Sequence, residues 1–499
     1  MVSGADAAPR PALSRRPALS PRQAAAYARR VETTREAAVP APPPYTPAGW
    51  RSLDPVARRL MAARLVRSIA QGALAVDFVL YLKALGWDAA RIGALLGAAS
   101  LVAAALMMAG GVLSDRLGRR PFLVAFQIVM TAGGAVLALH PRSWVLVGGA
   151  VLLSYGRGAN GAAGPFGPVE QAWLAQRVPP GQRGQVFSLN GAVGFWGMGL
   201  GSLVGAAVPL FARVWPGLAA YEPLFILSAV VAAINWWQIA TLAEAKPARG
   251  AEGAAASAPG SRGSTLEGVP PRAAGSDPGR APRGEAAVRR RENVAMALLA
   301  AVNAVNSLGI GLFSPLLPYW FSARYGAGAA GIGSVYGLTF LLTGFSSLAT
   351  GQLTTRVGLV RAVVWVRVLG AALLCAMPLM PTYALAAGAY VVRSMMNRGS
   401  AGARQAFGAG LVRDSRRGLA TSLNGLSMRL PSAIGPAVGG WLMSAGSLDL
   451  PFYLSAGLQL TYVALFGTVL GRYEQGAPAP PRRRAAAGND GAAALRPPG

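Results

Sequence analysis

The chain has few of the side chains with which enzymes do most of their chemistry. It contains one cysteine and one histidine among 499 residues, and only 13% of its residues are charged. In a typical soluble domain, roughly a quarter of the residues are charged. Cys375 alone cannot form a disulfide framework or a thiolate metal site within the chain, and His140 has no partner histidine. No nucleotide-binding loop of the GxxxxGK type is present. The sequence therefore predicts no enzyme, no cofactor and no metal site.

Lysine is also scarce, because Lys83 and Lys246 are the only two. The formal charge is nevertheless +28, so almost all of the positive charge belongs to arginine. Nucleic-acid binding would require basic residues on a folded face, whereas these arginines gather in turns and tails. With 53% hydrophobic residues and a mean hydropathy of +0.40, the chain is expected to lie in a membrane and to bind no nucleic acid.

Long apolar runs dominate the rest of the sequence. A stretch of roughly 18 to 25 apolar residues crosses the ~30 Å hydrocarbon layer as a helix. Twelve such stretches are present, and they predict an all-α integral membrane protein with twelve transmembrane helices in two six-helix bundles. They lie near residues 60–82, 91–113, 121–140, 143–166, 185–211, 222–242, 294–320, 331–353, 362–380, 382–404, 418–443 and 451–470.

Composition divides the chain into five segments. Residues 1–57 are rich in Pro, Ala and Arg and have no apolar core of a signal peptide, so they are expected to form a disordered tail. Residues 58–243 and 293–472 form the two predicted bundles. Residues 244–292 have the composition of a disordered linker, and residues 473–499 that of a second tail.

Arginines recur in every second loop, and positively charged loops stay on the cytoplasmic side. The intervening loops carry only scattered charges such as Lys83 and Arg213. We therefore expect a cell-membrane protein with both termini in the cytoplasm. The arginines that mark this side are Arg58, Arg59, Arg116, Arg119, Arg120, Arg177, Arg183, Arg289 to Arg291, Arg356, Arg361, Arg413, Arg416, Arg417 and Arg482 to Arg484.

The two halves repeat one another. Over more than thirty residues, positions of the first half match positions of the second at a constant offset of 240. Further along, RGQVFSLNG from Arg183 matches RGLATSLNG from Arg417. A parallel repeat of six spans predicts two bundles related by an axis along the membrane normal, with a binding site between them. The pairs that differ by 240 are Gly86 and Gly326, Ile92 and Ile332, Gly93 and Gly333, Gly111 and Gly351, Arg116 and Arg356, and Gly118 and Gly358.

Three passages resemble motifs of the major facilitator superfamily of secondary transporters. The sequence GVLSDRLGRR from Gly111 is similar to the signature loop between spans two and three, and LSYGRGANG from Leu153 is similar to the span-four motif. The sequence GPAVGG from Gly435 resembles the exporter motif, although it lies in span eleven and that motif belongs in span five. The resemblance covers residues 58–472 and implies the twelve-helix fold of this superfamily.

The resemblance also implies a latch that holds the two bundles together on the cytoplasmic side. In the second half, Thr355 lies at the position equivalent to Asp115, and Arg404 lies at the position equivalent to Glu170. Because the second half lacks both acids, we expect the working latch to lie in the first half. The alternative is a solvated, positively charged turn without a latch. The predicted latch residues are Gly111, Asp115, Arg116, Gly118, Arg119, Arg120 and Glu170.

Charged residues within the spans need a reason, because each costs at least ~2.5 to 3.5 kcal/mol at the helix centre. Polar residues three, four or seven apart form stripes that are expected to face a wet, positively charged cavity. There Arg393 and Arg429 could bind a carboxylate or phosphate of the substrate, or the arginines could serve structure alone. The predicted cavity residues are Arg67, Gln71, Asn160, Asn303, Asn306, Arg393 and Arg429.

Two further residues are candidates for proton coupling. Asp77 is the one deep acid and could load and release a proton, or it could lie ionised near the outer mouth. The resemblance implies a coupling role for Arg157, and the alternative is a hydrogen bond in helix packing.

These observations predict a monomeric transporter that exports a drug or metabolite by alternating access, as a proton antiporter. Its expected partners are a small-molecule substrate, the proton and membrane lipid. An importer or exporter of an organic anion or a sugar is an alternative. A membrane sensor or assembly factor that no longer transports is another.

Overall fold

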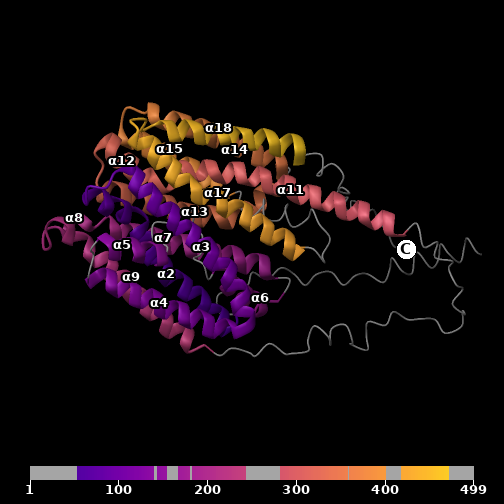
Figure 1. The fold of residues 1–499 in the computed structure, drawn as a ribbon, viewed down its shortest axis with the longest axis horizontal. Helices are drawn as coiled ribbons and strands as arrows, with labels where there is room; N and C mark the ends of the chain where they lie inside the picture. The colour runs from indigo at the N-terminus through magenta and orange to yellow at the C-terminus, as the bar shows by residue number, and fades with distance from the viewer. Residues whose placement is uncertain are drawn as a thin grey trace, which may run out of the picture. The chain divides into compact units, whose positions relative to one another are not determined.

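The protein is almost entirely helical. The computed structural model describes residues 53–139, 143–153, 167–179, 182–242, 281–357, 359–399 and 417–470. Within these ranges every regular element is a helix and no strand occurs. Figure 1 shows the long helices packed alongside one another. The all-α prediction is confirmed.

The first half contains a helix at each of its six predicted spans. A single turn of 3-10 helix at Gly217–Tyr221 precedes the last of them. The helices are α2 (Pro55–Ala84), α3 (Ala89–Leu117), α4 (Arg119–Leu139), α5 (Ser143–Leu153), α6 (Gly167–Gln176), α7 (Arg183–Gly205), α8 (Val208–Phe211) and α9 (Glu222–Ala240).

The second half likewise has a helix at each predicted span. Short 3-10 turns at Ser314–Leu316 and Met377–Leu379 follow two of these helices, and a π-helical turn at Phe466–Leu470 follows the last. The helices are α11 (Ala281–Phe313), α12 (Leu317–Tyr325), α13 (Ala329–Val357), α14 (Leu359–Ala376), α15 (Tyr383–Gly399), α17 (Arg417–Ser444) and α18 (Leu450–Leu465).

Helix α11 begins earlier than the sequence indicated. It starts at Ala281, so the last residues of the predicted linker 244–292 are helical. This segment contains alanines and places Glu285 four residues before Arg289, a spacing that favours a helix. Residues 243–280 lie outside the described part of the chain.

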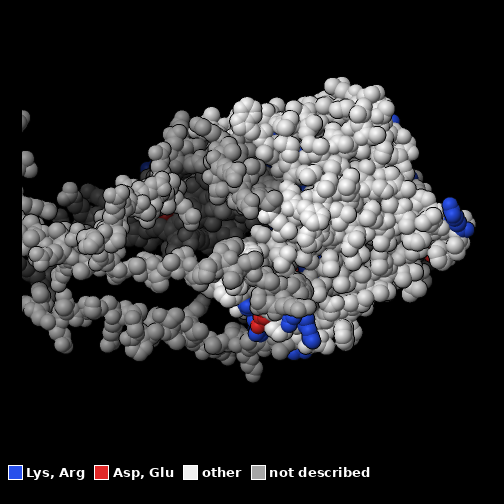
Figure 2. Space-filling model, turned by 180° about the vertical axis from the view of Figure 1, so that it is seen from behind, with Lys and Arg blue, Asp and Glu red and all other residues white. Residues whose placement is uncertain are grey.

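Eight stretches of described helix are long and apolar enough to cross a membrane. The other predicted spans correspond to α5, α14, α15 and α17, so the number twelve stays a prediction. On the face shown in Figure 2, most of the described surface carries no charged group. The eight are Pro55–Ala84, Ala89–Gly110, Arg119–Leu139, Gln185–Phe211, Gly217–Ala240, Glu292–Tyr325, Ala329–Leu348 and Leu450–Thr468.

The turn after the first span of each half is built in the same way. Gly86 follows α2 with φ +81°, and Gly326 follows α12 with φ +66°. Glycine adopts this left-handed conformation without the steric cost that other residues carry. These two glycines are partners in the 240-residue repeat, so the repeat read from the sequence has a structural counterpart.

Helices α2 and α7 touch backbone to backbone. A Cβ atom at Gly197 would lie 2.5 Å from the carbonyl oxygen of Leu65, and one at Gly201 would overlap the carbonyl of Ile69. Gly205, four residues further on, faces Ala73 and Asp77. Glycines spaced four apart allow such close approach. Glycines 197, 201 and 205 thus form one packing face of α7 against α2.

The two halves meet through α3 against α17 and through α7 against α13, which lie side by side in Figure 1. Gly93 on α3 packs against the backbone of Pro436 and Gly440. Its repeat partner Gly333 on α13 packs against Ser202 and Ala206. The same repeat position thus makes a close backbone contact in both of these interfaces, which we call seams, as a twofold-related pair of bundles requires.

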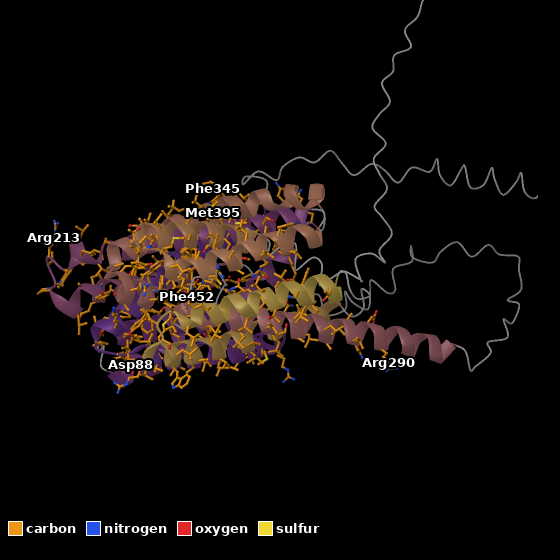
Figure 3. The ribbon with its side chains drawn as sticks, turned by 90° about the horizontal axis from the view of Figure 1, so that it is seen from above. Asp88, Arg213, Arg290, Phe345, Met395 and Phe452 are labelled. Carbon is orange, nitrogen blue, oxygen red and sulfur yellow. The ribbon has the colours of Figure 1, made fainter. Side chains whose placement is uncertain are left out.

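These seams lie toward one end of the bundle. Asp88 and Arg213 mark that end and Arg290 marks the opposite one, as Figure 3 shows. We refer to them as the Asp88 end and the Arg290 end. At the Asp88 end, Lys83 Nζ donates to Ser322 Oγ at 2.9 Å, and the Ala90 amide donates to Ser444 Oγ at 2.8 Å. Both hydrogen bonds join the first half to the second.

Candidate functional site

A buried ion pair joins the first span to α6. Arg67 Nη1 and Nη2 donate to Glu170 Oε1 and Oε2 at 2.5 Å and 2.6 Å, in a two-pronged contact. Each residue is only 6% exposed. Glu170 also lies in the first turn of α6, where the helix dipole favours a negative charge. Within the first half, this pair fixes α2 against α6.

The pairing differs from what the sequence suggested for each residue. Arg67 was expected to line the cavity, and Glu170 to act in the latch with Asp115 and Arg119. The structure brings Arg67 and Glu170 together across 103 residues of sequence, and the cavity and latch roles of these residues stay predictions. No spacing rule in a single sequence reveals such a contact between separate helices.

The predicted latch turn is held to helices of its own half. Gly118 ends α3 with φ +96°, and its amide donates to the Ser114 carbonyl at 3.0 Å. Arg119 Nη1 donates to the Ala172 carbonyl at 2.9 Å, and Arg120 donates to the Ala240 carbonyl. These contacts connect the start of α4 to α6 and to the end of α9.

The remaining latch residues are only partly described. Arg116, in the last turn of α3, is exposed. Gly111 and Asp115 lie on α3, but the surroundings of both fall outside what the structure describes. The latch between the two halves therefore stays a prediction.

Asp77 is enclosed between α2 and α7. It is 1% exposed, and neither carboxyl oxygen has a hydrogen-bond partner among the described residues. Oδ2 lies against Gly205, where an added Cβ would overlap it, and Tyr221 is within electrostatic reach. A carboxyl group in this position can change its charge without breaking a hydrogen bond to the described part of the chain. Arg157, the other coupling candidate, lies outside the described residues, as does Asn160.

Arg393 in the second half is held by neutral groups. It is 5% exposed, and its Nε and Nη2 atoms donate to the Gly370 carbonyl and to Gln459 Oε1, each at 3.2 Å. Its guanidinium also lies over the Phe313 ring, 4.7 Å from the centroid. This geometry fits the structural role that the sequence analysis kept as an alternative to substrate binding.

A second buried arginine of this half, Arg367, was missed by the sequence analysis. It lies on α14, is 1% exposed and donates to Asn306 Oδ1 at 3.0 Å. Its guanidinium also lies 5.5 Å from the centre of the Tyr462 ring. The available signal was an arginine in the middle of the apolar run VVWVRVLG. Asn303, one turn before Asn306 on α11, is buried as well.

Arg64 differs from the other buried arginines. It is 8% exposed, and its Nε atom has no hydrogen-bond partner among the described residues. Among the described residues, the charged groups that act on it are Arg67 and Glu170. Its guanidinium packs against Gly194 of α7, where an added Cβ would lie 2.6 Å from Nε.

The two remaining cavity candidates, Gln71 and Arg429, are half-buried. Gln71 lies on α2 and Arg429 on α17, in the first and second half respectively. The structure describes no polar contact for either side chain, and a role in substrate binding stays a prediction for both.

The chain is similar in sequence to known multidrug resistance proteins. The chain is 35% identical over 126 residues to the multidrug resistance protein MdtH of Cronobacter sakazakii, which covers 25% of this chain and 30% of that protein. It is 30% identical over 156 residues to MdtH of Edwardsiella ictaluri, covering 31% and 36%. The match thus spans about a third of each relative.

Solved structures share the fold over nearly their whole length. A D-xylose–proton symporter superimposes with a TM-score of 0.60 at 13% identity, covering 82% of this chain and 96% of the symporter. The human organic anion transporter MFSD10 (TETRAN) gives 0.53 at 15% identity, covering 83% and 100%. At such identity the likeness shows the fold alone.

The model of one family matches both halves of the chain. It covers residues 60–302 and 299–497, and its description is the Major Facilitator Superfamily. Members of this family are transporters, so the chain is not an enzyme. The chain therefore belongs to the major facilitator superfamily and is a multi-pass membrane protein.

Proposed function

We propose that this protein is a proton-driven secondary transporter that exports a small organic molecule by alternating access. The observation that carries the proposal is the seam between the halves. Near the Asp88 end, Gly93 and Gly333 bring backbones into contact, and hydrogen bonds from Lys83 and Ala90 to serine hydroxyl groups add to them. Among the described residues no ion pair joins the two halves, so such a seam can open without separating opposite charges.

Proton coupling is assigned to Asp77. Its buried carboxyl group touches Gly205, in the helix that packs against α13 of the second half. A change of charge there alters the electrostatics next to that seam. Release of a proton leaves a buried carboxylate, which favours a state with more water or a cation near α2. The proton and the conformation are thereby linked.

Export and drug efflux are suggested by the similarity to multidrug resistance proteins MdtH, which covers about a third of those relatives. We assign the Arg290 end to the cytoplasm because the arginine-rich loops predict it. The structure is then closed toward the outside, and the predicted latch around Asp115 and Arg119 would close the cytoplasmic side in the opposite state.

The decisive experiment is reconstitution of the full chain in liposomes with an imposed pH gradient. Ethidium, benzoate and a hexose serve as probes of the cation, anion and sugar classes. We expect gradient-dependent accumulation of at least one probe, and none in empty liposomes. Equal fluxes with and without the gradient would remove proton coupling, and an absence of flux for every probe would contradict transport.

A further inference from the structure

We propose that Arg64 binds the acidic group, a carboxylate or a group of similar shape and charge, of the transported molecule. The inference rests on the proposed transport function and names a substrate class for it. It transfers the anion-binding role that the sequence assigned to Arg393 and Arg429 to a different residue, in the first half of the protein.

Arg64 lacks a hydrogen-bond partner at its Nε atom. The residue is 8% exposed, and within the part of the chain that the structure describes Nε makes no hydrogen bond. A buried unpaired charge costs several kcal/mol, so it persists only where something compensates it. Arg393, in contrast, already has a carbonyl, an amide oxygen and an aromatic ring around it.

The charges around Arg64 are not balanced. Among the described residues, one further cation, Arg67, and one carboxylate, Glu170, lie within its electrostatic reach. Both oxygens of Glu170 are engaged by Arg67, so the group of three carries one uncompensated positive charge. Residues 154–166, which link α5 to α6, contain no Asp or Glu that could supply the missing negative charge.

A glycine of α7 faces the guanidinium of Arg64. A Cβ atom at Gly194 would lie 2.6 Å from Nε and 2.9 Å from Nη2 of Arg64. The glycine therefore leaves room for the planar head group of Arg64 on the α7 side. Arginine offers five N–H donors in a rigid fork, which matches the two oxygens of a carboxylate.

The test measures anion binding by the purified full-length protein in nanodiscs. The melting temperature Tm is followed while benzoate, inorganic phosphate or chloride is titrated. We expect saturable stabilisation by benzoate. For Arg64→Gln the apparent Kd should rise about tenfold to a hundredfold, since a hydrogen bond to a charged group is lost. Gly194→Ala should weaken binding as well, because it displaces the guanidinium without removing its charge.

Controls separate this site from a general loss of charge. Arg213→Gln removes an equally positive but exposed arginine at the Asp88 end and should leave the Kd for benzoate within about twofold. Without any anion, Arg64→Met should raise the Tm, because it removes an unpaired buried charge. Arg67→Met should lower it, because Glu170 then loses its partner.

Two outcomes would overturn the inference. One is benzoate stabilisation that is absent in the wild type or unchanged in Arg64→Gln. The other is Arg64-dependent stabilisation by phosphate or chloride alone, which would identify a free inorganic ion as the occupant. Gradient-driven transport of ethidium in the same preparation would show that the proposed function holds even if this substrate class is wrong.

Discussion

At the scale of single residues, the buried charges of the first half fall into three states. Arg67 and Glu170 form an ion pair with one another. Asp77 is an enclosed acid without a hydrogen bond to the described residues. Arg64 is a buried cation whose Nε atom has no hydrogen-bond partner among them. An ion pair in a low-dielectric interior gains little over an apolar pair, but a broken one is costly. The three states therefore predict different responses to mutation.

Removing one partner of the ion pair should destabilise the protein. In Glu170→Gln, Arg67 is left without its carboxylate, at a cost of about 3–5 kcal/mol. Thermal unfolding of the purified protein should show a lower Tm. The double variant Arg67→Met with Glu170→Leu should recover most of the loss. An unchanged Tm for Glu170→Gln would mean that the pair is not formed in the membrane.

Neutralising Asp77 should uncouple transport from the proton. Asp77→Asn keeps the shape of the side chain and removes its titration, so we expect pH-driven accumulation in liposomes to be lost. Exchange of labelled for unlabelled substrate without a gradient should continue, because the helices still pack. Undiminished pH-driven transport in this variant would remove Asp77 from the mechanism.

At the scale of helices, small residues decide where two backbones can touch. Helix α7 presents Gly201 to the backbone of Ile69, whereas Gly191 on the same helix has nothing within 4 Å of an added Cβ. Because both lie in the interior of one helix, they differ in packing and not in backbone conformation. The contrast gives an internal comparison.

Adding one methyl group at these two positions should have opposite effects on stability. Gly201→Ala forces α2 and α7 apart, which costs about 1–3 kcal/mol. Gly191→Ala meets no obstacle and should stabilise the helix by up to ~1 kcal/mol through its higher helix propensity. The Tm of both variants is the measurement, and equal shifts would contradict the close approach seen at Gly201.

Helix positions and repeat register were accessible from the sequence, whereas partners between helices were not. Apolar length placed a helix at every predicted span, and the 240-residue register foretold that Gly93 and Gly333 occupy equivalent places. The contact of Arg67 with Glu170 depends on how α2 and α6 are rotated, which neither periodicity nor composition determines. The early start of α11 was missed because the composition suggested a linker.

At the scale of the whole molecule, the seam at the Asp88 end should open and close during transport. The Ala90 amide and Ser444 Oγ are 2.8 Å apart across this seam. Cysteines at both positions, in a chain whose single native cysteine Cys375 is replaced by alanine, should form a disulfide. We expect oxidation to stop transport and a reductant to restore it.

The single variants Ala90→Cys and Ser444→Cys, treated with the same oxidant, serve as controls. Full transport by the oxidised double variant, with the disulfide confirmed by mass spectrometry, would mean that the halves do not separate at this end. Alternating access about this seam would then be wrong.

The neutral groups that contact Arg393 have an electrical consequence. Its positive charge lies within α15, and the groups that hold it there are a carbonyl, an amide oxygen and an aromatic ring. Moving one elementary charge through 100 mV of membrane potential changes the free energy by about 2.3 kcal/mol. Any shift of α15 along the membrane normal is therefore work against the voltage. The balance between the two conformations in a polarised cell should then differ from that of the same protein in detergent.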